Sequence, residues 1–237
     1  MAKAALVTGG GKRLGRAIAL GLAREGFDLA VHYNASEAHA RSAAVEIGDL
    51  GRRCELFQCD LADATAARSM IDNVFEAMPA CELLINSASI FERRSFDQTD
   101  EQFLDRTLAV NFKAPFFLSQ QFAKRCDQGH IVNLLDTKVS RNFTPYFAYT
   151  LSKKLLAEFT RLAACELAPR IRVNGICPGP ILPAAGQSDE SFRKLSSRIP
   201  MQRPGSPDAI VSAVLYLVGN EFVTGECLFV DGGEHLQ

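Results

Sequence analysis

The sequence predicts a single α/β domain over residues 1–237, doubly wound, with a parallel sheet of about seven strands and helices on both faces. Short apolar runs of strand type alternate with longer segments of helical periodicity along the whole chain. No repeat or low-complexity linker divides the chain, whose 237 residues suit one large α/β domain. A glycine-rich turn directly follows the first apolar run, where a strand would pass into a helix.

The first half of the chain alternates regularly between the two element types. The predicted strands are 4–8, 29–33, 55–58 and 83–86, and the predicted helices are about 14–26, 36–50 and 64–77. Leu14, Ile18 and Leu22 recur at helical spacing in the first helix, which Gly26 ends. Ser36 is a suitable N-cap for the second helix, and Gly51 stops it.

The second half continues the pattern with one irregular region. We expect a long helix over about 100–125 broken only at Pro115, a strand over 131–135, a helix of about 20 residues from Tyr146, and a strand over 172–176. Residues 182–204 have weak periodicity and mixed charge, which is typical of a mobile substrate loop with one short helix. A helix over 208–218 and a strand over 228–230 complete the fold.

Composition excludes several classes of function. The formal net charge of -1 leaves no basic field to attract nucleic acid or an anionic membrane, and no apolar run is long enough to span a bilayer. The seven cysteines are scattered, which indicates reduced thiols, and the four histidines lack metal-ligand spacing. We therefore expect a cytoplasmic protein without a metal site.

Residues that follow the predicted strands would share one rim of the sheet, because ligands of doubly wound folds bind at the carboxyl ends of the strands. They lie in the segments 9–15, 86–91, 136 and 178–181. The segment 8–15 lies between a strand and a helix N-terminus, where bare backbone approaches a pyrophosphate closely. A tight turn without a ligand is the alternative interpretation of these glycines.

Tyr149 and Lys153 are spaced to share one face of a helix, so the lysine charge would lower the proton affinity of the phenol. This spacing alone is common by chance. Together with the glycine loop, Asn86-Ser87-Ala88, Asn111 and Pro178-Gly179, it resembles the short-chain dehydrogenase/reductase family. The resemblance covers essentially the whole chain, including Asp231-Gly232-Gly233.

The resemblance implies a Rossmann-like reductase in which Tyr149 transfers a proton, Lys153 holds the nicotinamide ribose and Asn111 anchors a water relay. The end of the second strand, residues 33–36, lacks the acid that would favour NADH, and Lys12 is placed to pair with a 2′-phosphate, so NADPH is the expected cofactor. The implied cofactor contacts are Thr8, Gly9, Lys12, Arg13, Leu14, Gly15, Tyr33, Asn34, Ser36, Asp60, Leu61, Asn86, Ala88, Ser89, Tyr149, Lys153, Pro178, Gly179 and Ile181. For Asp60, a helix cap is the alternative role.

Three positions depart from the usual family pattern. Arg13 stands where most members have glycine, Asn86-Ser87-Ala88-Ser89 replaces Asn-Asn-Ala-Gly, and Asp136 replaces a serine thirteen residues before the tyrosine. A carboxylate repels the oxyanion formed in carbonyl reduction, whereas it accepts hydrogen bonds from the N–H groups of a nitrogen heterocycle. These residues resemble pteridine reductases and the related bacterial dihydromonapterin reductases.

The expected reaction is therefore NADPH-dependent reduction of a C=N bond in a dihydropterin, such as dihydromonapterin or dihydrofolate. The implied substrate contacts are Arg13, Ser89, Phe91, Asp136 and Tyr149, with Phe91 stacking on the pterin. Alternatively, Thr137 or Ser140 replaces the missing serine, Asp136 caps a loop, and Phe91 is a packing residue. The rival functions are a carbonyl reductase of the 3-oxoacyl or polyol type and a non-catalytic NADPH-binding sensor. Apolar faces on the long helices favour a homotetramer, with a dimer as the alternative.

Overall fold

The computed structural model describes residues 3–184 and 186–237, and its seven described strands form one parallel sheet with the order β3-β2-β1-β4-β5-β6-β7. The strands are β1 (Ala4–Val7), β2 (Asp28–Tyr33), β3 (Cys54–Gln58), β4 (Cys81–Asn86), β5 (Gly129–Leu134), β6 (Ile171–Pro178) and β7 (Cys227–Val230). The strand order reverses between β1 and β4, which opens a crevice at their carboxyl ends. The predicted doubly wound fold is confirmed.

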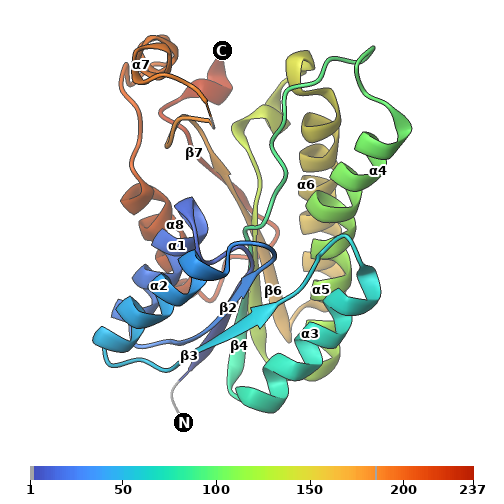
Figure 1. Cartoon of the computed structure of the whole chain (residues 1–237), viewed down its shortest axis with the longest axis vertical. Coiled ribbons are helices and arrows are strands. Elements are labelled where there is room, and N and C mark those ends of the chain that lie inside the picture. The colour runs from blue at the N-terminus through green and yellow to red at the C-terminus, as the bar shows by residue number, and fades with distance from the viewer. Residues whose placement is uncertain (1–2, 185) are drawn as a thin grey trace.

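Helices cover both faces of the sheet (Figure 1). On one face lie α1 (Arg13–Arg24), α2 (Glu37–Asp49) and α8 (Pro207–Gly219), and on the other lie α3 (Ala64–Ala77), α5 (Ala114–Arg125) and α6 (Phe147–Leu167), with α4 (Glu101–Leu108) beside α6. A hydrophobic core lies on each face of the sheet, and each strand contributes side chains to both cores, because successive side chains point to opposite faces. In β1, Ala5 and Val7 pack under α1 and α8, whereas Ala4 and Leu6 pack under α3 and α5.

The long helical segment is interrupted earlier than the sequence predicts. Its first part, α4, is followed by a π-helical turn over Ala109–Lys113, and α5 then begins with Pro115 in its first turn. Proline lacks a backbone N–H and its ring clashes with the carbonyl four residues earlier, which here belongs to Asn111. The backbone widens to accommodate this clash, so the break is centred on Asn111 and not on Pro115.

The predicted substrate loop contains one short helix, as expected: α7 (Asp189–Ser196). It lies at the end of the molecule where the C-terminus also emerges, above the carboxyl edge of the sheet (Figure 1). The hydroxyl of Ser188 caps α7 by accepting from the backbone N–H of Ser191. Residue 185 of this loop lies outside the described residues.

Ser36 occupies the N-cap position of α2, but its hydroxyl makes no capping hydrogen bond there. The expectation that this side chain caps the helix is therefore wrong, and the hydroxyl stays available at the carboxyl end of β2. The seven cysteines, all of which the structure describes, are free thiols. In the described part of the chain, no helix has both the length and the apolar character to cross a membrane.

Candidate active site

A cleft of about 660 Å³ opens at the carboxyl ends of the strands and contains most of the predicted site residues. The predicted residues that line it are Gly9, Lys12, Arg13, Leu14, Gly15, Tyr33, Asn34, Ser36, Asp60, Leu61, Ala88, Ser89, Phe91, Asp136, Tyr149, Lys153, Pro178, Gly179 and Ile181. They converge because parallel strands end at the same edge of the sheet. Three predicted residues, Thr8, Asn86 and Asn111, do not line the cleft.

The glycine loop has the shape of an anion cradle. Gly9 has a φ of 64°, a conformation that favours glycine. A Cβ on Gly15 would lie 2.3 Å from the carbonyl oxygen of Gly9, so the turn closes only with glycine there. The loop leads into α1, whose first turn has neither a side-chain cap nor an acid. Its free N–H groups and positive dipole end therefore fit a pyrophosphate.

His32, which the sequence did not single out, holds this loop in place. Its Nδ1 accepts a hydrogen bond of 3.1 Å from the backbone N–H of Gly9, and its Nε2 donates to the carbonyl of Cys59 at 3.0 Å. Burial lowers the pKa of His32, so the ring is neutral and one nitrogen accepts while the other donates. The only signal in the sequence was a histidine inside an apolar strand.

Arg13 has the left-handed φ of 49°, a conformation that favours glycine, which agrees with the glycine that the family resemblance implies at this position. Its guanidinium donates a hydrogen bond of 2.7 Å to the carbonyl of Pro183, in the segment that the sequence predicts as a substrate loop. Arg13 therefore connects the glycine loop to the segment that borders the opposite side of the cleft.

The carboxyl end of β2 presents amide, hydroxyl and phenol groups to the cleft through Asn34, Ser36 and Tyr33. Asp60 accepts from the backbone N–H of Ala62 at 3.0 Å and lies 3.4 Å from the amide of Asn34. The helix-cap alternative for Asp60 is wrong, because Asp63 caps α3. Lys12 is exposed at the same end of the cleft, so a cation and hydrogen-bond donors meet where an extra phosphate would lie.

At the other end of the cleft, Tyr149 and Asp136 form a short hydrogen bond. The phenol of Tyr149 donates to Oδ2 of Asp136 at 2.7 Å. Both Tyr149 and Lys153 lie on the buried face of α6, and the ammonium of Lys153 donates to the carbonyl of Leu134 at 2.6 Å. The carboxylate thus occupies the place beside the phenol that the sequence predicts for it.

The protonation states differ from the expectation that Lys153 lowers the proton affinity of Tyr149. Burial, followed by the nearby Asp136, raises the pKa of Tyr149 well above its ordinary value. Burial lowers the pKa of Lys153 to about 8, and the Asp136 charge opposes only part of this effect. Desolvation of the phenol and its carboxylate partner therefore determine the direction of the shift, and Tyr149 is a protonated donor in the ligand-free protein.

Neither alternative hydroxyl replaces the missing serine. The hydroxyl of Thr137 is fully buried and donates to Asp231 at 2.7 Å, away from the cleft. The hydroxyl of Ser140 donates to the carbonyl of Thr137 at 2.8 Å. Asp136 does also cap the short 3-10 helix Thr137–Ser140 through its Oδ1, as the loop-cap alternative proposed, but its Oδ2 still faces Tyr149.

The side chains of Thr8 and Asn86 lie in the protein interior beneath the cleft and do not line it. The hydroxyl of Thr8 accepts from the backbone N–H groups of Ser87 and Ala88 at 2.9 and 3.0 Å, which joins the ends of β1 and β4. The amide of Asn86 donates to the side chain of Asn133 at 2.8 Å. Both side chains are buried, so the prediction that they contact the cofactor directly is not supported.

Asn111 is also fully buried, and its amide is engaged with protein atoms. Its Oδ1 accepts from the backbone N–H of Ile90 at 2.7 Å. Its Nδ2 donates to the carbonyl of Ile90 at 2.9 Å and to the hydroxyl of Ser152 at 3.1 Å. Ser152 in turn donates to the carbonyl of Tyr149 at 2.7 Å. Asn111 therefore holds the segment beside Phe91 against α6, and the water relay stays a prediction.

Phe91 is the end of an aromatic column at the wall of the cleft. Its ring stacks on Tyr146 with centroids 4.5 Å apart and an angle of 7°, and Tyr146 stacks on Phe143 at 5.9 Å. The edge contact of Phe91 with Tyr149 has a centroid distance of 4.7 Å. Phe91 is 41% exposed, so one side of the ring packs in the column while the rest stays open to the cleft.

Charged residues that the sequence did not predict complete this end of the cleft. Lys138 forms an ion pair of 3.2 Å with Asp136, and Glu234, from the C-terminal 3-10 helix, forms one with Arg141. Lys138 stands two residues after Asp136, but no periodic pattern marked it. Further cleft residues that belong to segments predicted at the rim or in the loop 182–204 are Gly11, Ser87, Ile90, Pro180, Leu182, Ala184, Gln187, Phe192 and Leu195. The cleft residues outside those segments are His32, Arg106, Val110, Leu134 and Leu135.

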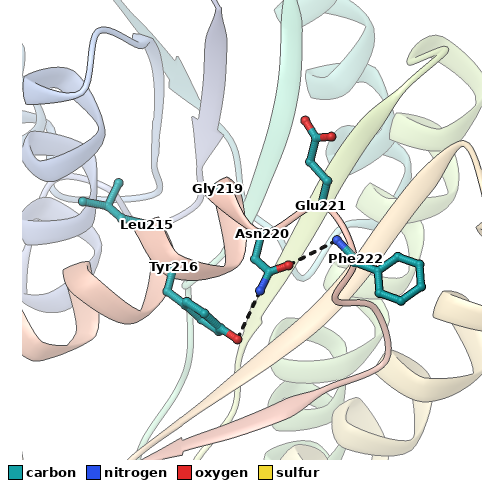
Figure 2. A pocket seen from close by; sticks show the side chains of 6 residues that line it. All are labelled: Leu215, Tyr216, Gly219, Asn220, Glu221 and Phe222. Carbon is teal, nitrogen blue, oxygen red and sulfur yellow. Dashed lines mark hydrogen bonds between the residues drawn. The ribbon is translucent and has the colours of Figure 1, made fainter.

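A separate, shallow hollow lies at the C-terminal end of α8 (Figure 2). Asn220 organises it by donating to the phenol of Tyr216 and accepting from the backbone N–H of Phe222, both at 3.3 Å. Glu221 is the only acid among its lining residues, and they include no base. This hollow therefore has no arrangement of side chains suited to catalysis.

Comparisons with known proteins agree with this geometry. A family model described as enoyl-(acyl carrier protein) reductase matches residues 11–235. The chain is similar to the FolM alternative dihydrofolate reductase 1 of Brucella suis, solved in complex with NADP, with 36% identity, a TM-score of 0.95, and coverage of 99% of this chain and 96% of that one. It is also similar to the 3-oxoacyl-(acyl-carrier-protein) reductase FabG of Staphylococcus aureus, with 32% identity over 100% of this chain and 99% of the relative.

A further relative is the uncharacterized oxidoreductase YghA of Escherichia coli, which is 32% identical over 98% of this chain and 82% of its own length. A short-chain dehydrogenase/reductase from Serratia marcescens superposes with a TM-score of 0.92 at 32% identity, over 98% of this chain and 97% of that one. The family match, the near full-length relatives and the cleft with Tyr149 and Lys153 lead to the same conclusion: the chain is an oxidoreductase of the short-chain dehydrogenase/reductase family.

Proposed function

We propose that this enzyme uses NADPH to reduce a C=N bond of a dihydropterin, such as dihydromonapterin, to the tetrahydro form, with dihydrofolate as a further substrate. The observation that carries the proposal is the hydrogen bond of 2.7 Å between Tyr149 and the Asp136 carboxylate. A carboxylate in this place repels a developing oxyanion, but it accepts hydrogen bonds from the N–H groups of a pterin.

Tyr149 is the proton donor in this proposal. Its raised pKa keeps the phenol protonated until the substrate nitrogen becomes basic, and Asp136, which accepts from the O–H in the ligand-free protein, positions the phenol oxygen. When Tyr149 gives its proton to the ring nitrogen, the ammonium of Lys153 offsets the phenolate that remains. With a pKa of about 8, Lys153 is mostly charged at neutral pH.

The other end of the cleft fits the cofactor. NADPH, when bound, supplies the hydride for the adjacent carbon of the substrate. The glycine loop and the first turn of α1 would hold the pyrophosphate, and Lys12 with Asn34 and Ser36 would hold the 2′-phosphate. No acid stands at residues 33–36 to accept the 2′-hydroxyl of NADH, which supports the preference for NADPH.

Phe91 supplies the flat surface that a pterin needs. Tyr146 occupies one face of its ring, so the pterin would stack on the open side within the cleft. The similarity to a FolM alternative dihydrofolate reductase solved with NADP supports the substrate class.

The similarity to FabG favours a second candidate, a 3-oxoacyl carbonyl reductase. That chemistry needs a hydroxyl or another donor beside Tyr149, and both Thr137 and Ser140 direct their hydroxyls to protein acceptors. Asp136 therefore argues against the carbonyl substrate.

The test measures NADPH oxidation against a panel of dihydropterins, dihydrofolate and an acetoacetyl thioester. We expect turnover of the pterins and little or none of the thioester. Strong turnover of the thioester without pterin activity would select the carbonyl reductase. Calorimetric binding of NADPH with no turnover of any compound would indicate a cofactor-binding sensor.

A further inference from the structure

The Asp136 carboxylate has two oxygens with different partners. Oδ2 accepts from the phenol of Tyr149, whereas Oδ1 accepts from the backbone N–H of Lys138 at 2.9 Å and from its ammonium at 3.2 Å. One residue thus binds Oδ1 through both its main chain and its side chain. We call these two hydrogen bonds from Lys138 to Oδ1 the clamp. Because the clamp occupies Oδ1, only Oδ2 is left to accept from the phenol of Tyr149.

The clamp operates in a partly desolvated place, where charges are less screened than on the surface. The side chains of Asp136 and Lys138 are 14% and 17% exposed, and both line the cleft. Most other ion pairs of the described residues are more exposed, so the Asp136–Lys138 pair differs from an ordinary surface salt bridge.

The surrounding acids make Lys138 important for the balance of charge at this end of the cleft. Asp231 and Glu234 approach the same segment, and Asp231 accepts from the hydroxyl of Thr137 beside Asp136. Burial raises the pKa of Glu234, while Lys138 and Arg141 lower it, so these groups act on one another electrostatically. Besides Lys138, the basic groups beside these acids are Arg141, which pairs with Glu234, His235, which contacts Asp231, and the buried Lys153.

We propose that Lys138 is a positioning residue for proton transfer, which holds the Asp136 carboxylate in the orientation that presents Oδ2 to Tyr149. This inference rests on the proposed function for the choice of substrate in the assay. The contacts of Lys138 with Asp136 do not depend on that function. Lys138 also offsets the repulsion between the carboxylate and the phenolate that forms when Tyr149 loses its proton. Its effect therefore belongs to the chemical step more than to substrate binding.

The experiment compares Lys138→Met and Lys138→Arg with the wild type, with Lys154→Met as the matched control. Lys154 contacts the same segment from outside the cleft, at the side chain of Asn142, and does not contact Asp136. We expect Lys138→Met to lower kcat by about 10- to 100-fold through misalignment, while KM and the NADPH dissociation constant change less than about threefold. Lys138→Arg should restore most of kcat, because it keeps a cation within reach of Oδ1.

An equal kcat in Lys138→Met and the wild type would overturn the inference, and so would a loss of the same size in Lys154→Met. The wild-type substrate panel decides the proposed function separately, and the variants are compared on whichever substrate the wild type reduces. Should the wild type reduce none, crystal structures of Lys138→Met and the wild type decide the matter. An unchanged Tyr149–Asp136 hydrogen bond in the variant would then refute the positioning role, and a rotated carboxylate would support it.

Discussion

Replacement of Asp136 tests the assignment of the substrate most directly. Its hydrogen bond with Tyr149, at 2.7 Å, involves an ionised acceptor, and such bonds contribute about 1.5–3 kcal/mol, compared with about 0.5–1.5 kcal/mol for neutral pairs. Asp136→Asn keeps the shape of the side chain and an acceptor oxygen. It should therefore lose only the part of the hydrogen-bond free energy that is due to the charge, about 1–1.5 kcal/mol. Asp136→Ser is too short to span the same distance and should lose the whole interaction.

The hydrogen bonds that the carboxylate would accept from the N–H groups of a bound pterin are charge-assisted in the same way and have the same range of energies. Their loss converts to a loss of rate. Because about 1.4 kcal/mol corresponds to a factor of ten, kcat/KM for a dihydropterin should fall by about 5- to 15-fold in Asp136→Asn and by about 10- to 150-fold in Asp136→Ser. The assay follows NADPH oxidation under first-order conditions in substrate. Asp136→Ser should in addition gain activity toward a β-ketoester, because serine donates a hydrogen bond to a carbonyl oxygen.

The control is the affinity for NADPH, which should stay unchanged because Asp136 lies at the end of the cleft opposite to Lys12 and Ser36. Thermal unfolding of both variants shows whether the fold is intact. Undiminished dihydropterin turnover in both Asp136→Asn and Asp136→Ser would refute the reasoning, since the carboxylate would then have no part in the reaction.

Three further predictions follow from the described contacts. Lys12→Ala should weaken NADPH binding about tenfold and leave NADH binding unchanged in calorimetry; equal losses for both would contradict its role at the 2′-phosphate. Thr8→Val should leave two backbone N–H groups unpaired and lower the free energy of unfolding by about 2–4 kcal/mol in urea, while Thr8→Ser should not. Burial, aided by Arg172, lowers the pKa of His130 to about 3 from its ordinary 6.5. The unfolded chain therefore binds the extra proton first, and stability should fall by up to about 1.4 kcal/mol per pH unit as the pH drops from about 6.5 toward 3. His130→Gln should flatten this dependence in thermal melts, and an unchanged slope would argue against it.

The elements of the fold were predictable because they depend on local periodicity. Buried parallel strands need short apolar runs, and the helices between them need apolar residues at helical spacing, so both patterns are visible in the chain. The glycine loop was predictable for a similar reason, since backbone that approaches itself as closely as Gly15 approaches Gly9 excludes a side chain. The short helix over Asp189–Ser196 also fell within the segment where one was expected.

The tertiary structure decided which side chains face the cleft. Thr8 and Asn86 follow the expected motif, yet they point into the protein, because partly buried backbone N–H groups and the buried Asn133 need partners there. The π-helical turn at Asn111 arises from a clash with Pro115 that periodicity does not reveal.

The electrostatics of the site were the least predictable part. The spacing of Tyr149 and Lys153 on one helix suggested that the lysine lowers the pKa of the phenol, but burial and Asp136 together raise it. The sequence by itself determined the fold, the glycine cradle and the identity of the carboxylate beside the phenol. Only the tertiary structure decided the protonation states and the contribution of Lys138, because desolvation and charge pairing depend on residues that come together from separate segments of the chain.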